Sequence, residues 1–395
     1  MTADDLAALV ALAGLPGMGP RRLRALVDRR PPSEAWVLAT AGHPGRLRLA
    51  LRTGDDVTTL AGAWSAAARG VDPAARLAAH EAAGVSVHPH PEVVGGAPSP
   101  GADATDGPEV ETMYPSGLVD DPDPPAVLFA QGSLEALDGP CVAVVGTRRC
   151  TGTGGGMARE LGRELAAAGV RVVSGLALGI DGAAHRGALD ALTGDPGAAP
   201  PIGVVGSGLD VPYPSRHRDL WAAVAGSGIL LSEAPLGLRP AAWRFPARNR
   251  LIAALAHVVV VVESHAVGGS LHTVHEAIQR DVEVMAVPGS VRNPAAAGTN
   301  QLLAEGATPV RDVEDVLMAL GLQRGRRRSR AERRPPPTAT AASVLDAFDW
   351  EPATFEHLAV RTGLDLPELA VALEQLVAGG WVLAEGGWYE RRVSA

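Results

Sequence analysis

The stretch VAVVGTRRCTGTGGG, residues 142–156, decides how this chain folds. It begins with an apolar run that is typical of a strand covered on both faces, and it continues into a glycine-rich turn that opens a helix. Arg148 and Arg149 stand in this turn, where a nucleotide-binding loop would present bare backbone amides. A strand, a turn and a helix N-terminus with guanidinium groups beside them are suited to holding phosphate.

Two familiar nucleotide-binding motifs fail in this turn. Gly152, Gly154 and Gly156 almost form the dinucleotide signature G-x-G-x-x-G, but its third glycine position falls on Met157. A Walker A loop needs lysine, and all 35 basic residues of the chain are arginine. The lack of lysine also excludes a Schiff base, so every cationic contact is expected to be a guanidinium group, which suits bidentate phosphate contacts and base stacking.

Apolar runs and helical patterns alternate from residue 126 to residue 318. The apolar runs are continuous in Val, Ile and Leu, which indicates strands covered by helices on both faces. We therefore predict an α/β fold with an extended, Rossmann-like, doubly wound parallel sheet and a ligand at the carboxyl ends of its strands. The predicted strands are 141–146, 170–174, 202–206, 228–232, 257–263 and 283–287. The predicted helices are 155–168, 182–192, 215–225, 247–256, 270–280 and 312–320.

Other segments flank this sheet domain, which we predict over 114–320. Residues 1–85 have helical patterns, and the turn LPGMGP favours a helix-hairpin-helix or SAM-like module whose turn amides can hold phosphate; the alternative is a plain helical turn. Residues 86–113 are rich in Pro, Gly and Ala and are expected to form a flexible loop, with His88 and His90 solvated beside it.

The C-terminal part is predicted to be a winged helix behind a linker. Residues 321–340 form an Arg/Pro-rich linker that contains RGRRRSRAERRPPP, either a solvated tether or an electrostatic contact to nucleic acid. Residues 341–395 show three helical patterns and a hairpin that turns at Gly386 and Gly387. Such domains often bind duplex DNA, although many serve only as protein contacts.

Composition limits the function classes. The N-terminus lacks the basic region of a signal peptide, and no apolar run reaches the roughly 18 residues that span a bilayer, so we expect a cytoplasmic protein without a membrane partner. Cys141 and Cys150 are too few for a structural zinc site, and no metal or cofactor is expected. The net charge of −9 means that a polyanionic partner must meet a local basic patch.

Polar and aromatic residues follow the other predicted strands. In SGLALGIDGAAH, residues 174–185, the glycines permit close backbone approach, Asp181 is expected to cap the next helix, and His185 is either a ligand contact or a packed neighbour. In WRFPARNRLIAALA, Phe245 lies among arginines. This composition favours single-stranded nucleic acid, because bases stack on aromatic faces while arginines contact phosphates.

Eight motifs, taken in order, resemble the DNA processing protein A family, also called DprA or Smf. They are GTRR, SGLALGIDGAAH, GSGLDVPYP, LSEAP, FPARNR, GGSLHT, AVPGS and AGTNQLLAEGA. The resemblance implies a non-catalytic homodimer that binds and protects single-stranded DNA and helps load RecA recombinase in DNA uptake, transformation or recombination. The candidate DNA-binding residues are Gly146, Thr147, Arg148, Arg149, Ser174, Gly175, Gly179, His185, Phe245, Arg248, Asn249, Arg250, Ser270 and Thr273.

Three positions mark the chain as a divergent member. Leu178, Thr153 and Val267 stand where the family usually has an arginine, a tyrosine and a basic residue. Three ligand-facing groups are therefore absent, which bears on affinity rather than on the fold.

An enzyme is the alternative interpretation. GGSLHTVHE, residues 268–276, is close to the PGGxGTxxE loop of Rossmann-like nucleoside monophosphate phosphoribohydrolases, although its spacing is one residue longer and the leading proline is missing. His272 and His275 lie three apart on one predicted helix without an evident third metal ligand, so we expect them to be exposed. A structural adaptor that acts through the winged helix would leave the arginine cluster unexplained.

Overall fold

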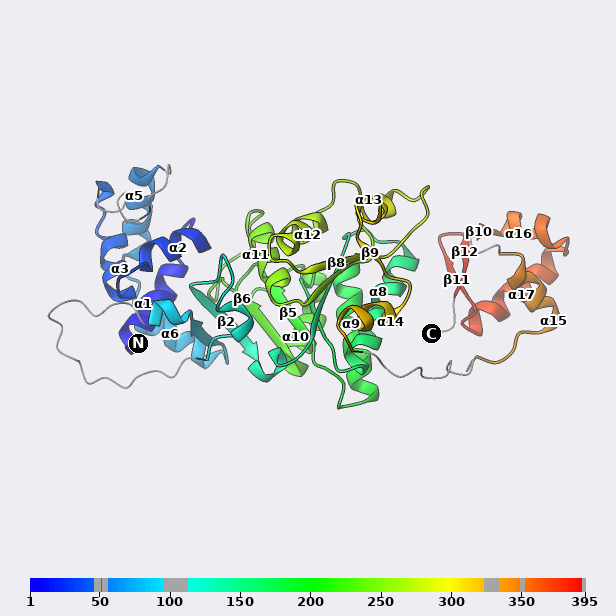
Figure 1. Ribbon diagram of the computed structural model, residues 1–395, viewed down its shortest axis with the longest axis horizontal. Helices are drawn as coiled ribbons and strands as arrows, with labels where there is room; N and C mark the ends of the chain where they lie inside the picture. The colour runs from blue at the N-terminus through cyan, green and yellow to red at the C-terminus, as the bar shows by residue number, and fades with distance from the viewer. Residues whose placement is uncertain (46–50, 52–55, 95–112, 323–333, 349–351, 393–395) are drawn as a thin grey trace. The chain divides into compact units, whose positions relative to one another are not determined.

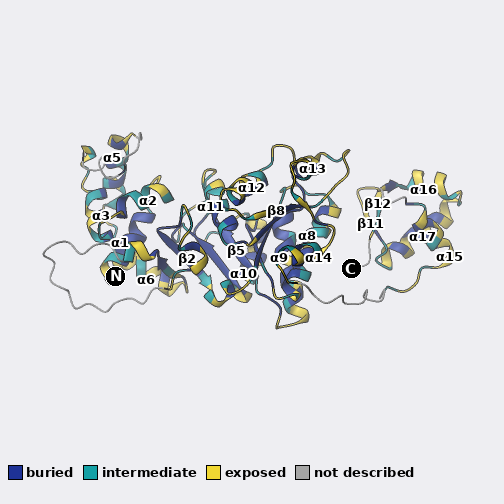
Figure 2. Cartoon of the chain, in the orientation of Figure 1, coloured by how far each residue is buried: buried dark blue, intermediate teal, exposed yellow. Residues whose placement is uncertain are grey.

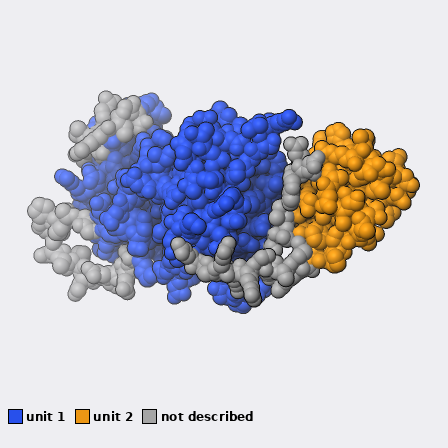
Figure 3. Space-filling view, turned by 45° about the vertical axis from the view of Figure 1, so that its right-hand side comes forward, with its two compact units in different colours: residues 1–323 blue, residues 324–395 orange. Residues whose placement is uncertain are grey.

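The structure is a computed structural model that describes residues 1–45, 51, 56–94, 113–322, 334–348 and 352–392. It divides into two compact units, Met1–Gln323 and Arg324–Ala395 (Figure 3). Most of the predicted flexible loop, at 95–112, and much of the predicted linker, at 323–333, lie outside the described residues. No helix in the described ranges is both long and apolar enough to cross a membrane.

A nine-stranded sheet forms the centre of the first unit (Figure 1). Its strand order is β1-β2-β6-β5-β4-β3-β7-β8-β9, and neighbouring strands run parallel from β6 to β9. The strands are β1 Ser86–Pro89, β2 Val127–Gly132, β3 Cys141–Val145, β4 Arg171–Ser174, β5 Ile202–Val205, β6 Ile229–Ser232, β7 Val258–Val261, β8 Glu283–Ala286 and β9 Thr308–Pro309. The six predicted strands are confirmed as β3 to β8, and the doubly wound, mostly parallel sheet is confirmed with them.

One edge of the sheet differs from the prediction. Strands β1 and β2 pair antiparallel with each other, and β2 pairs antiparallel with β6. Residues 86–89 therefore belong to the sheet and not to a flexible loop. His88 and His90, expected to be solvated, are buried: the His88 ring contacts the Ser86 hydroxyl at 2.7 Å, and the His90 ring contacts the Val119 carbonyl at 3.1 Å.

Helices cover both faces of the sheet, whose strands are buried throughout most of their length (Figure 2). Val142 and Val144 of β3 pack in one core and Ala143 and Val145 in another, which explains why this strand is apolar at every position. The first core includes α8 Gly152–Ala167, α9 Ile180–Gly194 and α14 Val313–Ala319. The second includes α11 Arg244–Ala254, α12 Ser270–Ile278 and α13 Ala297–Ala304.

The N-terminal helices belong to the same compact unit as the sheet and share an apolar core with it. Leu9, Leu12 and Trp64 are in the same buried cluster as Phe129 of β2 and Leu230 of β6. A third set of helices contributes to this cluster or lies beside it. These are α1 Ala3–Ala13, α2 Pro20–Val27, α3 Pro32–Thr40, α5 Val57–Ala68, α6 Pro73–Ala82, α7 Pro91–Val94 and α10 Arg218–Ser227.

The second unit has its own core and the expected winged-helix elements. Three helices, α15 Ala339–Asp346, α16 Phe355–Thr362 and α17 Leu366–Ala378, pack around a cluster that includes Phe348. A small sheet has the order β10-β12-β11, formed by Ala353–Thr354, Trp388–Arg391 and Val382–Glu385. The hairpin turns where predicted, at Gly386 and Gly387, whose φ angles of 58° and 85° favour glycine.

Close packing of α8 on α9 depends on Gly162. A Cβ atom at this position would collide with the backbone carbonyl of Ala184. We predict that Gly162→Ala lowers the free energy of unfolding by about 1 to 3 kcal/mol, because the helices must move apart. Gly156→Ala in the same helix is the matched control: a Cβ there meets nothing within 4 Å, so the better helix propensity of alanine should leave stability equal or raise it by up to about 1 kcal/mol. Denaturant unfolding of both variants measures this, and an equal response would contradict the packing argument.

Candidate nucleic-acid interface

A groove of about 860 Å³ lies at the carboxyl edge of the sheet, lined by the loops that follow β3 to β7. Strand order reverses here, because β4 and β7 flank β3 on opposite sides, and such a switch point opens a crevice between the diverging loops. The amide of Thr147 donates to the carbonyl of Glu263 at 2.8 Å and joins two of these loops. The predicted residues that line the groove are Gly146, Thr147, Arg148, Arg149, Phe245, Arg248, Asn249, Ser270 and Thr273.

An arginine and two aromatic rings stack along one wall of the groove. The guanidinium carbon of Arg148 lies 5.3 Å from the centroid of the Phe245 ring. Phe245 in turn lies 5.4 Å from Tyr213, between centroids, with the rings inclined by 33°. Arg148 and Arg149 are exposed, and Tyr213 is 43% exposed. We call Arg148, Phe245 and Tyr213 the aromatic stack; it offers cationic groups and ring faces to the same ligand.

Tyr213 is a site residue that the sequence analysis missed. It lies in GSGLDVPYP, one of the eight motifs that carry the family resemblance, but it was not among the candidate DNA-binding residues. The sequence did contain a signal for Tyr213: it is an aromatic residue in a Gly/Pro-rich turn after a parallel strand. Such turns meet at the carboxyl edge of the sheet, where the groove lies.

The N-terminus of α8 is occupied by the chain's own carboxylate. Glu263 accepts hydrogen bonds from the Thr151 amide at 2.9 Å and the Thr151 hydroxyl at 2.6 Å, and this hydroxyl also accepts from the Gly154 amide at 3.0 Å. A side chain at Gly154 would collide with the carboxylate. The Thr151 amide, expected to hold phosphate, therefore binds Glu263, and the Gly154 amide binds the Thr151 hydroxyl. The exposed Arg148 and Arg149 are cationic groups of this loop.

Arg248 forms part of the floor of the groove. Its guanidinium packs on Gly175, where any Cβ would collide with it, and donates to the Val204 carbonyl at 2.7 Å. Burial lowers the pKa of Arg248 to about 10, and the nearby Asp181 opposes this effect. Asp181 was expected to cap α9, but the cap residue is Gly179 and no side-chain cap bond is present among the described residues at this helix start. The Asp181 carboxylate instead accepts from the Gly175 amide at 3.1 Å, and burial raises its pKa.

The other predicted residues lie outside the lining of the groove. Ser174 is buried and donates to the Val144 carbonyl at 2.7 Å, while Gly175 lies beneath Arg248 and Gly179 is the N-cap residue of α9. His185 is fully buried, and burial lowers its pKa to about 4. Of the two interpretations of His185, a ligand contact or a packed neighbour, this geometry fits the packed neighbour.

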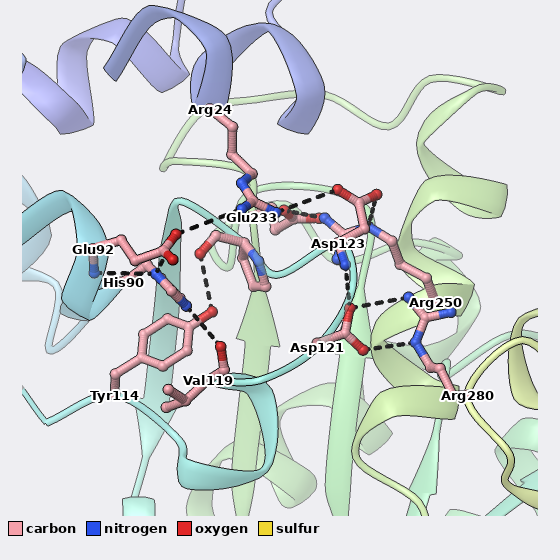
Figure 4. A network of polar contacts seen from close by, with 11 residues as sticks. Arg24, His90, Glu92, Tyr114, Val119, Asp121, Asp123, Glu233, Arg250 and Arg280 are labelled. Atoms are coloured by element: carbon pink, nitrogen blue, oxygen red, sulfur yellow. Dashed lines mark hydrogen bonds and ion pairs between the residues drawn. The ribbon is translucent and has the colours of Figure 1, made fainter. Parts of the chain in front are cut away.

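Arg250 was expected to contact phosphate, but it lies in a buried network of ion pairs (Figure 4). Its side chain pairs with Glu233 at 2.6 Å and with Asp123 at 3.3 Å. Burial raises the pKa of Glu233, and the positive charge of Arg250 opposes this rise. Arg24 of α2 approaches Asp123 at 3.8 Å, so the network also connects the N-terminal helices to the sheet. Two carboxylates therefore already pair with the guanidinium that was predicted to contact phosphate.

Comparisons with known proteins identify the family. A model of the family DNA recombination-mediator protein A matches residues 109–321, which is more than half of the chain, and a model of the DprA winged helix domain matches residues 328–385. The chain belongs to the DNA recombination-mediator protein A family. The resemblance inferred from the eight motifs is thereby confirmed.

Individual members of this family show how far the similarity extends. Protein Smf of Escherichia coli K12 is 35% identical over 286 residues, which cover 71% of this chain and 75% of that protein. DNA processing protein DprA of Bacillus subtilis is 39% identical over 209 residues, or 53% of this chain and 68% of that protein. The X-ray structure of DprA from Streptococcus pneumoniae matches with a TM-score of 0.59 and 27% identity, covering 80% of this chain and 98% of that one.

The loop that suggested a phosphoribohydrolase is arranged differently from a nucleotide clamp. Gly268 and Gly269 line the groove, but the Glu276 carboxylate pairs with Arg280 at 2.6 Å and is not part of the groove lining. Arg280 also pairs with Asp121 at 2.7 Å (Figure 4). The glutamate that would hold a nucleotide therefore belongs to the buried ion-pair network.

The Arg250 network predicts a pH-dependent loss of stability. Arg250→Ala leaves Glu233 buried without its partner, and we expect the free energy of unfolding to fall by about 3 to 5 kcal/mol at neutral pH. A carboxyl group whose folded-state pKa is raised stabilises the fold below its ordinary pKa of about 4.3, and this contribution disappears as the pH rises through the folded-state value. The difference between variant and parent should therefore shrink as the pH is lowered from neutral.

Denaturant unfolding at several pH values measures this difference. Adding Glu233→Gln to Arg250→Ala removes the uncompensated charge and should recover part of the stability at neutral pH. A decrease of equal size at every pH would contradict the assignment of the effect to Glu233.

Proposed function

We propose that the groove binds single-stranded DNA with little sequence preference and catalyses no reaction on it. The observation that supports this proposal is the aromatic stack, in which the exposed Tyr213 and the half-buried Phe245 lie beside the exposed Arg148. Arg149, the next residue of the loop, is exposed as well. Arginine contacts phosphates and aromatic faces stack on unpaired bases, whereas the bases of a duplex are already stacked on one another. The contacts involve the backbone and base faces, so they carry little sequence information.

The remaining lining of the groove suits a strand that passes close to the protein backbone. Gly269 leaves open space at the surface, since a Cβ there would meet nothing within 4 Å, and Asn249 and Ser270 provide polar side chains. Asp181 also lines the groove, but its charge is opposed by the neighbouring Arg248. The local balance is therefore cationic although the whole chain carries a net charge of −9.

Family membership supports a wider role. The family is described as a DNA recombination mediator, and we infer that this chain protects single strands, helps load RecA recombinase onto them in the cytoplasm, and acts as a homodimer. Two grooves on one strand would add avidity that a single site lacks.

Light scattering at micromolar concentration tests the dimer, and a monomeric mass would contradict it. The rate of RecA filament formation on a single strand, measured with and without the protein, tests the loading role.

Salt dependence tests whether Arg148 and Arg149 bind phosphates. We expect the double variant Arg148→Ala with Arg149→Ala to lower the slope of log affinity against log salt by about 0.7 for each phosphate that the protein no longer neutralises. Both side chains are exposed, so the thermal stability should stay within the small range typical of surface changes. Arg186→Ala removes an exposed arginine of α9 that does not line the groove, and it should leave the slope unchanged.

An unchanged slope in a double variant that still melts like the parent would exclude the loop as a phosphate-binding element. The affinity for a single strand should also exceed that for a duplex of equal length. Release of the base from nucleoside monophosphates is measured beside the binding, and we expect none. Turnover would favour the phosphoribohydrolase instead.

A further inference from the structure

A second groove, of about 680 Å³, adjoins the first. Pro246 lines both grooves, so a ligand that leaves the first groove over this residue enters the second. The opposite wall comes from the N-terminal helical segment, where Gly17, Gly19, Pro20, Arg21 and Arg22 form the turn LPGMGP and the start of α2. The shared apolar core fixes this turn against the sheet domain.

The second groove repeats the chemistry of the first. Trp243 lines it with 45% of its surface exposed, and the guanidinium carbon of Arg244 lies 4.4 Å from the centroid of its ring. Tyr213 and Trp243 are the two large aromatic side chains that are exposed in the described part of the first unit, and each one lines one of the two grooves. Arg21 adds an exposed guanidinium to the second groove.

The turn is held rigidly beside Trp243, and the acidic residues nearby are paired with arginines. Arg22 donates to the Gly17 carbonyl and so braces the turn, while Gly19 packs against the Trp243 ring, which a Cβ would meet at 3.4 Å. Asp123 and Glu276 also line the groove, but Asp123 pairs with Arg250 at 3.3 Å and Glu276 with Arg280 at 2.6 Å. Both carboxylates are therefore paired with arginines of the protein itself.

We propose that the second groove is a subsite for the same DNA strand. The strand held at the aromatic stack continues over Pro246, stacks a further base on Trp243 and places a phosphate near Arg21. This inference rests on the proposed function of the first groove. It predicts that a short strand fills the first groove alone, whereas a longer strand binds more tightly because it also reaches Trp243.

Binding of a thymidine homopolymer series of about 4 to about 20 nucleotides to the full chain tests the subsite. The parent should bind more tightly as the length increases until both grooves are filled. Trp243→Ala should weaken the binding of long strands by about 5-fold to about 100-fold, the range expected when one base no longer stacks on a ring, and should leave short strands unaffected. Trp243→Phe keeps a ring face and should retain most of the affinity that long strands gain over short ones. Arg21→Ala should reduce this gain and lower the salt dependence of long-strand binding.

Matched variants separate failure of the subsite from failure of the first groove. Arg148→Ala should weaken short and long strands alike, and Arg186→Ala should weaken neither. Thermal melting checks that each variant is folded. Suppose that the parent binds short strands. If Trp243→Ala then leaves the binding of long strands unchanged, or weakens the binding of short and long strands equally, the subsite is wrong while the proposed function stands. If the parent binds neither length, the proposed function itself fails.

Discussion

The carboxylate of Glu263 holds the loop on which the rest of the groove depends. It accepts two hydrogen bonds from Thr151 at the end of this loop, while its backbone carbonyl accepts from Thr147 at the beginning. A negative charge is favourable at the N-terminus of α8, where unpaired amides and the helix dipole meet it. Both ends of the loop are thus held by Glu263. Arg148 and Arg149 are exposed between these ends, and Arg148 lies over the ring of Phe245.

Burial divides the arginines of the first unit into two groups with different roles. Arg250 and Arg280 lie against carboxylates in the network that joins the N-terminal helices, the segment leading into strand β2 and the sheet. Such guanidinium groups are held in place, since moving either partner leaves a charge uncompensated in a poorly solvated region. Arg148, Arg149 and Arg21 are exposed and line the grooves. An acidic protein can in this way present a cationic surface at one edge of its sheet.

Local sequence patterns predicted those parts of the fold that depend on local chemistry. Strands β3, β5, β6 and β7 were predicted because they are buried at every position, which requires an unbroken apolar run. Strands β4 and β8 were predicted from apolar runs of the same kind, although each begins with a residue that is not buried. The winged hairpin was predicted because its turn needs two residues with positive φ, here Gly386 and Gly387. Strand β1 was not predicted, because its four residues lie beside a Pro- and Gly-rich stretch. They form a strand by pairing with β2, which lies about forty residues later in the chain.

The sequence by itself determined the sheet, the winged helix and the cluster of glycine, arginine and aromatic residues after the strands, because apolar periodicity and turn chemistry are local properties. Only the tertiary structure decided which of these residues line the first groove. Arg248 and Arg250 stand two apart in one motif and look alike in sequence, yet one lies on the floor of the groove and the other pairs with Glu233 and Asp123. The reason is that the charge available to a ligand depends on which carboxylates the fold brings to each guanidinium, and those carboxylates come from distant parts of the chain.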